Sequence, residues 1–282
     1  TNFGAIGAFA MRAGSEVVAV LATGSLWTVV PGTVRVTLTG AFRDGVHARD
    51  LGFRLCGDLV SGKLPLDYDY KVVEFAGPAV EAMPLAARVA LCNTLTEIGA
   101  INTLFPPLNP DGTPVSPELR ALVTDEGAPL DGEVTIDLGD LSPQVALPGG
   151  PAKAAPIEQA AGRKVDHAFI GSCGSGMYED FAVAGDLLRG RKVAPGVRFF
   201  IVPGTVQVAR RLADEGLAQV FMEAGAVLLP PGCGPCAGGV MAPLGPGEVS
   251  VSTAATNPTG RLGSPDSEAY LASPITVAAS AV

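Results

Sequence analysis

Three of the five cysteines stand in glycine-rich loops with few large side chains, and they constrain this chain more than any other feature. Cys233 and Cys236 form a C-x-x-C pair, and Cys173 lies in a second loop further upstream. Two thiolates separated by two residues can turn toward one metal centre. We therefore expect one metal site built from two loops.

The number of ligands narrows the kind of metal site. A structural zinc site closes with four Cys or His ligands, and neither His47 nor His167 stands at a ligand-like spacing from the three cysteines. An iron–sulfur cluster with one iron left open needs only three thiolates. A structural zinc knot stays open as the less favoured alternative.

Composition excludes several classes of protein. The 282 residues allow one large or two medium domains with ample buried core. A formal charge of −9 disfavours a general nucleic-acid-binding surface, including an RNA-binding role. No apolar run approaches the roughly 20 residues that span a membrane, and no basic region of a signal peptide precedes the first apolar segment. An odd number of cysteines indicates a reducing compartment, so we expect a cytoplasmic enzyme.

The first residues are unusually apolar. Thr1–Ala10 is rich in small and apolar side chains, and Ser15–Gly24 has the spacing of a helix that begins at a serine cap. A segment this apolar is expected to be buried against something. Two interpretations of Thr1 stay open: a truncated chain, or a residue freed by cleavage from an upstream chain.

The next part of the chain alternates strands with helices. Strands are predicted over Thr33–Gly40 and Tyr70–Gly77, and helices over His47–Gly57 and Leu85–Ile98, with glycine ending the first of them. The second strand carries Glu74 in its middle, which points either to solvent or into a site. This alternation predicts a layered α/β fold.

A second α/β run follows a proline-rich stretch. We place a domain boundary near Asp131, which gives residues 1–32 as the remnant of a first domain, 33–130 as a second domain and 131–282 as a third. A short helix is expected over Ala155–Arg163. The strands His167–Gly171 and Ala226–Leu229 each lead into a cysteine loop, and the carboxyl ends of strands are where open α/β sheets bind ligands.

The remaining cysteines and the first histidine have simpler interpretations. Cys56 and Cys92 lie on apolar helix faces and are expected to be core residues. His47, at the start of its helix, is expected to be a surface or capping residue.

Several motifs in sequence order resemble the aconitase superfamily, most of all the large subunits of 3-isopropylmalate dehydratase-like hydro-lyases. They are Val72–Gly77, Cys92-Asn93, Ile136–Pro143, Phe169–Cys173, Val202–Gly204, Glu223–Gly225, Pro231–Gly238 and the tail from Ser252 through Arg261 to Pro274. The resemblance covers nearly the whole chain and implies the layered α/β/α domains of the aconitase fold.

The resemblance also implies a cofactor. The family holds a four-iron, four-sulfur cluster with three cysteines, which would here be Cys173, Cys233 and Cys236, and the open iron binds the substrate hydroxyl as a Lewis acid. The implied reaction is the dehydration or isomerisation of a small hydroxy acid. The family's base is a serine on a swivelling domain or small subunit that this sequence lacks.

The resemblance assigns four further residues. Glu74 resembles the active-site glutamate that handles the hydroxyl or bound water, and Arg261 resembles an arginine that pairs with a substrate carboxylate. Ser172 and Asn257 are expected to contact substrate. Thr256 stands where the family usually has a second arginine, and Gly174-Ser175 where it has Thr-Asn, so we expect a substrate with a different or missing second acid group.

The N-terminal segment resembles the residues that directly follow an Asp-Ser-His motif of the family. We therefore expect a multi-chain enzyme with an upstream chain that carries this motif. The alternative is an aconitase-fold hydrolase in which Thr1 is the catalytic nucleophile and its own amine is the base.

Overall fold

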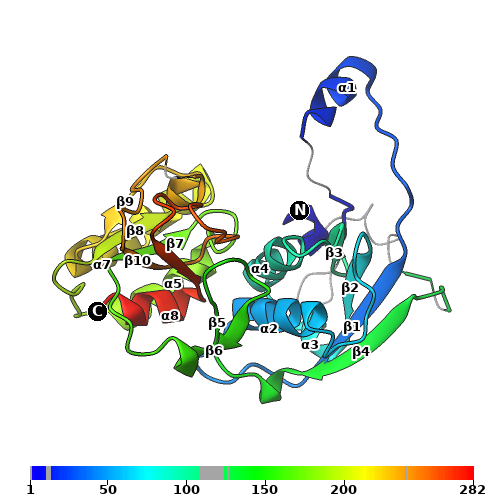
Figure 1. Cartoon of the computed structure of the whole chain (residues 1–282), viewed down its shortest axis with the longest axis horizontal. Coiled ribbons are helices and arrows are strands. Elements are labelled where there is room, and N and C mark those ends of the chain that lie inside the picture. Colours follow the sequence, from blue (N-terminus) through cyan, green and yellow to red (C-terminus); the bar gives the residue numbers. More distant parts are fainter. Residues whose placement is uncertain (1, 11–13, 108–123, 126, 239) are drawn as a thin grey trace.

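A computed structural model describes residues 2–10, 14–107, 124–125, 127–238 and 240–282. Two sheets, each covered by helices, lie beside one another, and a slender arm projects from the N-terminal side (Figure 1). The predicted layered α/β architecture is confirmed.

The first sheet contains four parallel strands in the order β3-β2-β1-β4. Its strands are β1 (Thr33–Thr39), β2 (Val72–Ala76), β3 (Asn102–Leu104) and β4 (Gly132–Asp137), and its helices are α2 (Ala48–Val60), α3 (Pro78–Glu81) and α4 (Leu85–Leu95). In β1 the side chains of Val34, Val36 and Leu38 are buried while the residues between them are partly exposed, as the alternation predicts.

The second sheet has the order β6-β5-β11-β10-β7-β8-β9. Its strands from β11 to β9 are parallel, and β5 and β6 add an antiparallel edge. The strands are β5 (Gln144–Ala146), β6 (Ala154–Pro156), β7 (His167–Gly171), β8 (Arg198–Val202), β9 (Val227–Leu228), β10 (Val249–Ser252) and β11 (Glu268–Leu271). The helices are α5 (Tyr178–Leu188), α6 (Val206–Asp214), α7 (Leu217–Ala224) and α8 (Pro274–Ser280), and the short 3₁₀ helices of the chain are η1 (Asn2–Ile6), η3 (Leu138–Asp140), η4 (Ile157–Gln159) and η5 (Gly234–Cys236).

Helix α2 joins the two halves of the molecule. It packs on α4 on one side and on β5 and β6 on the other (Figure 1). Phe53 of α2 is fully buried in a cluster with Phe169, Val202 and Leu271 of the second half. The backbone N–H of Gln144 in β5 donates a 2.8 Å hydrogen bond to Asp50 Oδ1 of α2. The halves therefore share one continuous set of buried contacts.

Helix α2 does not end at Gly57, as the sequence predicted, but continues to Val60. A Cβ on Gly57 would lie 3.2 Å from the Ala154 Cβ, so the glycine allows β6 to approach the helix closely. The helix continues through Gly57 because its packing against β6 outweighs the low helix propensity of glycine, which costs only about 1 kcal/mol.

One other expectation, a helix over residues 155–163, differs from the structure. Residues 155–163 form the end of β6, the short η4 and turns rather than one helix. Strand β4 begins just after Asp131 but pairs with β1, so the first sheet extends past the expected boundary at that residue. Parallel pairing on the free side of β1 gives β4 its hydrogen bonds. The division into three domains stays a prediction.

The arm contains α1 (Glu16–Thr23) and the extended residues that follow it. None of the residues of α1 is buried, although burial was expected for so apolar a segment. The helix ends at Gly24, which adopts the left-handed conformation typical of a helix C-terminus. No helix in the described ranges is long and apolar enough to cross a membrane.

Candidate active site

The Cys173 loop leaves the carboxyl end of β7. Gly171, the last strand residue, has φ of +133°, and a Cβ there would lie 1.8 Å from the Val202 carbonyl oxygen. Only glycine fits this close crossing of β7 and β8. Ser172 then adopts φ of +60° with its side chain buried, and its N–H donates to the Val202 carbonyl at 3.0 Å. The turn leaves Cys173 exposed.

The second cysteine loop rests on the same residue of β8. Cys233 and Cys236 bracket η5, in which the Cys236 N–H donates to the Cys233 carbonyl at 3.1 Å. A Cβ on Gly234 would lie 2.6 Å from Val202 Cγ2. Both loops are thus drawn together over the end of β8, as parallel strands with a common carboxyl edge require.

The three thiols form one electrostatic group. Burial by the surrounding protein raises the pKa of the Cys173 thiol, and the neighbouring Cys236 and Cys233 raise it further. Cys173 is nevertheless open to solvent, as expected for a thiol in a recess. Negative charge on Cys236 or Cys233 therefore disfavours the ionised form of Cys173.

The structure leaves the kind of metal group open. In the described part of the chain, no group of three His, Cys, Asp or Glu side chains is placed to hold a single metal ion. Three thiols from two loops are the donor set that the sequence predicts for an iron–sulfur cluster, and which metal group they hold stays a prediction.

Asn93 of α4 links the Cys173 loop to the N-terminal segment. Its Nδ2 lies 2.8 Å from the Cys173 carbonyl oxygen, 2.9 Å from the Val89 carbonyl oxygen and 2.5 Å from Asn2 Oδ1 in η1. The first half of the chain thereby holds the cysteine loop of the second half.

Glu74 lies at the end of the first sheet in a separate cavity of about 220 Å³. Arg35 on the adjacent strand places both Nε and Nη2 at 2.9 Å from Glu74 Oε1, and the Thr124 hydroxyl donates to Oε2. Gly7, which follows η1, lines the same cavity. Among the described residues, no contact joins Glu74 to the cysteine loops; the N-terminal segment runs past both.

The other predicted site residues differ from one another in exposure and in hydrogen bonding. Arg261 is exposed and its guanidinium is available to a ligand. Asn257 is buried and its Nδ2 points at the carbonyl oxygens of Ala269 and Leu147, at 2.6 and 3.0 Å, while Oδ1 has no partner in the described chain. Ser172 Oγ is likewise buried, and its hydroxyl lies beside the Cys173 thiol, where a side-chain hydrogen bond counteracts the rise in the pKa of that thiol. Thr1 lies outside the described residues.

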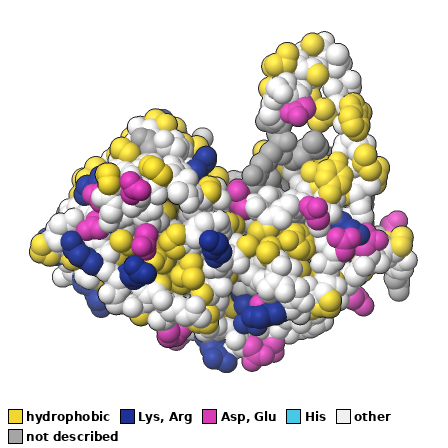
Figure 2. All heavy atoms as spheres, viewed as in Figure 1, with side chains coloured by type: hydrophobic (Ala, Val, Ile, Leu, Met, Phe, Trp, Pro, Cys, Tyr) yellow, Lys and Arg dark blue, Asp and Glu magenta, His cyan; other side chains and the backbone are white. Residues whose placement is uncertain are grey.

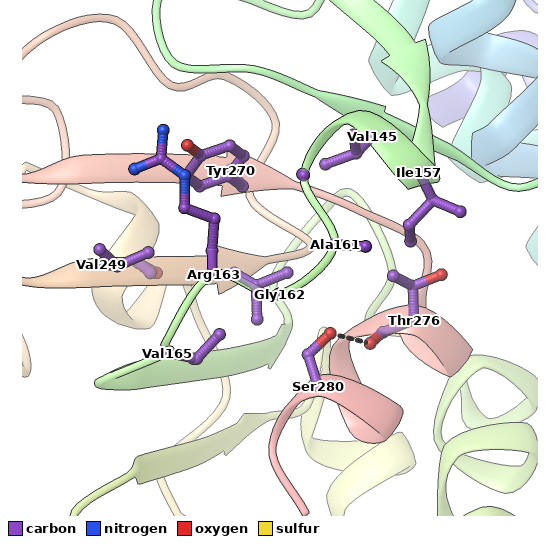
Figure 3. A pocket seen from close by; sticks show the side chains of 13 residues that line it. Val145, Ile157, Ala161, Gly162, Arg163, Val165, Val249, Tyr270, Thr276 and Ser280 are labelled. Carbon is purple, nitrogen blue, oxygen red and sulfur yellow. Dashed lines mark hydrogen bonds between the residues drawn. The ribbon is translucent and has the colours of Figure 1, made fainter.

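A second cavity of about 220 Å³ lies at the opposite edge of the second sheet (Figure 3). Val249 begins β10 there and Val165 precedes β7, so this edge carries the amino ends of the strands. Arg163 and Tyr270 lie together on one side of the cavity, and Thr276 and Ser280 of α8 lie on the other (Figure 3). The cavity is remote from the cysteine loops.

Comparison with known proteins assigns the chain to a family. The model of the aconitase family (aconitate hydratase) matches residues 1–282. This chain belongs to the aconitase family. The family and the fold class expected from the sequence are confirmed.

The curated aconitase-family relatives include dehydratases. The 3-isopropylmalate dehydratase large subunit 1 of Methanopyrus kandleri is 40% identical over 291 residues, which cover 99% of this chain and 67% of the relative. The corresponding subunit of Pyrococcus furiosus is 40% identical over 292 residues, covering 100% and 67%. A probable methanogen homoaconitase large subunit from Methanothermobacter thermautotrophicus is 36% identical over 287 residues, covering 100% and 66%.

The chain thus spans about two thirds of the length of these aconitase-family relatives. Their names confirm the expected enzyme class, a hydro-lyase, and the words "large subunit" imply a partner subunit for them. A more distant solved structure, aconitase X of Thermococcus kodakaraensis, matches 80% of this chain and 50% of that one with a TM-score of 0.46 and 16% identity.

Two core predictions are confirmed, and one residue was missed. Cys56 and Cys92 are fully buried, and His47 caps α2 by accepting a hydrogen bond from the Arg49 N–H. Arg49 itself, fully buried beside the cysteine loops, was not singled out. The sequence did contain one indication of its importance: Arg49 is a charged residue inside a helix that is expected to lie in the core.

Proposed function

We propose that this protein is an iron–sulfur-dependent hydro-lyase that acts on a small hydroxy carboxylic acid in the cytoplasm. The observation that carries the proposal is the convergence of Cys173, Cys233 and Cys236 on the end of β8. When bound there, a cluster with one open iron would supply a Lewis acid that polarises the substrate hydroxyl.

Residues of this chain would bind the substrate and transfer the proton. Arg261, exposed and planar, would bind a substrate carboxylate through a bidentate contact. Glu74 would exchange a proton with the departing hydroxyl or with water. Its present partner is Arg35, whose Nη2 lies 2.9 Å from Glu74 Oε1. Asn257 keeps an unpartnered buried oxygen among the described residues, and Ser172 has a buried hydroxyl beside Cys173; both could order a ligand.

The substrate is proposed only as a class. The relatives act on isopropylmalate or homoaconitate-type acids by name. Thr256 stands where the sequence comparison with the family expects an arginine, which would remove one cationic partner of a carboxylate. A hydroxy acid with one fewer carboxylate contact therefore fits this chain better than the substrates in those names.

The enzyme is proposed to contain further polypeptide. A swivelling small subunit would supply the base that takes the proton from carbon, and an upstream chain would supply the Asp-Ser-His motif. The exposed apolar side chains of the arm support the second partner. Leu21, Trp27 and Val30 are each more than 80% exposed, and exposed apolar groups of this size mark a docking surface (Figure 2).

The proposed role of Glu74 is tested by Glu74→Gln in the assembled enzyme. Loss of a proton-transfer group costs about 10²- to 10⁴-fold in kcat, so we expect a fall of about that size, measured as the rate of formation of the unsaturated acid. Iron content is expected to stay at the wild-type level because Glu74 does not contact the cysteine loops. The matched control is Glu133→Gln on the exposed side of β4. A Glu74→Gln enzyme of unchanged kcat would contradict the role.

A further inference from the structure

Arg49 is a fully buried cation with few partners. It lies in the first turn of α2, where its Nη2 donates to the Ala254 carbonyl at 2.8 Å and its guanidinium carbon lies 4.9 Å from the centre of the Phe53 ring. Its Nε and Nη1 have no hydrogen-bond partner among the described residues. A buried charge without partners is strongly disfavoured, so these two donors need an acceptor.

The free donors face the first cysteine loop. A Cβ on Gly174, the residue that follows Cys173, would lie 2.5 Å from Arg49 Nη1 and 2.7 Å from the Thr253 carbonyl oxygen. The guanidinium thus occupies the space that a side chain at position 174 would need. Glycine at this position keeps the cation in direct contact with the loop backbone.

Nearby carboxylates do not satisfy Arg49. Both oxygens of Asp50 accept backbone hydrogen bonds, from Gln144 at 2.8 Å and from His47 at 2.7 Å. Asp180 Oδ2 accepts from the Met177 N–H at 3.0 Å, and its buried Oδ1, 3.4 Å from His47 Nε2, has no hydrogen-bond partner among the described residues. None of the carboxylate oxygens of Asp50 and Asp180 is hydrogen-bonded to Arg49.

Asp180 has the largest favourable effect on the charge of Arg49, and the thiols of Cys173 and Cys236 come next. Burial lowers the pKa of the Arg49 guanidinium, and Asp180, Cys173 and Cys236 counteract this by raising it. Two of the three neighbours that favour the charged guanidinium most are therefore predicted cluster ligands.

We propose that Arg49 is a positioning residue that supplies the buried positive charge behind the cysteine site. The inference rests on the proposed function, because the charge it offsets belongs to the iron–sulfur group that the three cysteines hold. Net charge and hydrogen bonds to sulfur set the reduction potential of such groups. Arg49 stabilises the more negative, reduced form and so raises that potential.

The test replaces Arg49 in the full-length protein loaded anaerobically with iron and sulfide. Arg49→Met and Arg49→Gln remove the charge, and Arg49→Lys keeps it. Arg54→Met, on the same helix but half-exposed and paired with Asp58, is the matched control. Far-UV circular dichroism reports folding, and a redox titration followed by electron paramagnetic resonance reports the potential.

We expect a more negative potential in the two neutral variants, a potential close to the wild type in Arg49→Lys, and no change in Arg54→Met. A folded neutral variant with the wild-type potential would overturn the proposal. If neither neutral variant folds, the lysine variant decides: a native-like fold with the wild-type potential supports a role for the charge, and a native-like fold with a clearly shifted potential contradicts it. A wild-type protein that takes up no iron would overturn the proposed function itself.

Discussion

At the residue scale, some buried polar side chains hydrogen-bond to backbone carbonyl groups, and others keep atoms that have no partner in the described structure. Asn93 and Asn257 use their amide nitrogens on carbonyl oxygens that fix loops. Arg49 instead keeps two buried nitrogens, Nε and Nη1, without partners in the described structure. Because native proteins leave few such atoms unpaired, the position of Nη1 beside Gly174 supports the proposed role of the Cys173 loop.

His167 provides a prediction about stability and pH. It is fully buried at the start of β7, with Nδ1 2.9 Å from Ser250 Oγ, and burial, aided by Arg198, lowers its pKa from 6.5 to about 4. Between these values the unfolded chain binds a proton that the folded protein does not. This histidine therefore removes stability as the pH falls from 6.5 to 4, by about 3 kcal/mol in total.

The measurement is urea denaturation of the wild type and of His167→Gln at several values of pH from 7 to 4.5. We expect the free energy of unfolding to fall less steeply with decreasing pH in the variant, whatever the constant offset between the two proteins. Parallel profiles would show that His167 does not titrate differently in the two states.

At the element scale, α2 positions the site because it is buried on two sides. It contributes Phe53 to the cluster that contains Cys236, and Arg49 to the Cys173 loop. The apolar and polar sides of one helix thus support both cysteine loops. The sequence predicted the helix but could not show its second contact surface, since that surface depends on β5 and β6, which lie about 90 residues away.

The contribution of Phe53 to the packing between the two halves of the molecule can be measured. Truncation of a fully buried phenylalanine costs about 3–5 kcal/mol, so we expect Phe53→Ala to lower the free energy of unfolding by that amount in chemical denaturation. Phe9→Ala is the matched control, because Phe9 is 45% exposed; its effect is expected to stay within about 0.5 kcal/mol. Equal effects of the two substitutions would contradict the role of Phe53 in joining the halves.

At the scale of the whole molecule, sequence reasoning succeeded where a pattern is local and failed where distant contacts decide. Both strand-end cysteine loops, the core cysteines and the His47 cap were predicted correctly because strand and cap signals lie within a few residues. The pairing of β4 with β1, the continuation of α2 through Gly57 and the role of Arg49 depend on residues far apart in the chain. The exposed arm contradicted the expectation of burial within these 282 residues.

The arm supplies a prediction about assembly. Trp27 is the one tryptophan in the sequence and is 85% exposed, so its fluorescence reports burial of the arm directly. We expect its emission to shift to shorter wavelength when the proposed upstream chain with the Asp-Ser-His motif is added, and the shift to be lost in Val30→Asp. Binding of that polypeptide, seen by size-exclusion chromatography, with unchanged emission would contradict docking on the arm.

The central claim is that three cysteines of this chain hold an iron–sulfur cluster with an open iron, and anaerobic iron and sulfide analysis tests it most directly. We predict about four iron and four sulfide per chain in the wild type, near-complete loss in Cys236→Ala, and wild-type content in Cys56→Ala, whose cysteine lies in the core. Iron retained equally in both variants, or an active enzyme without iron, would contradict the account.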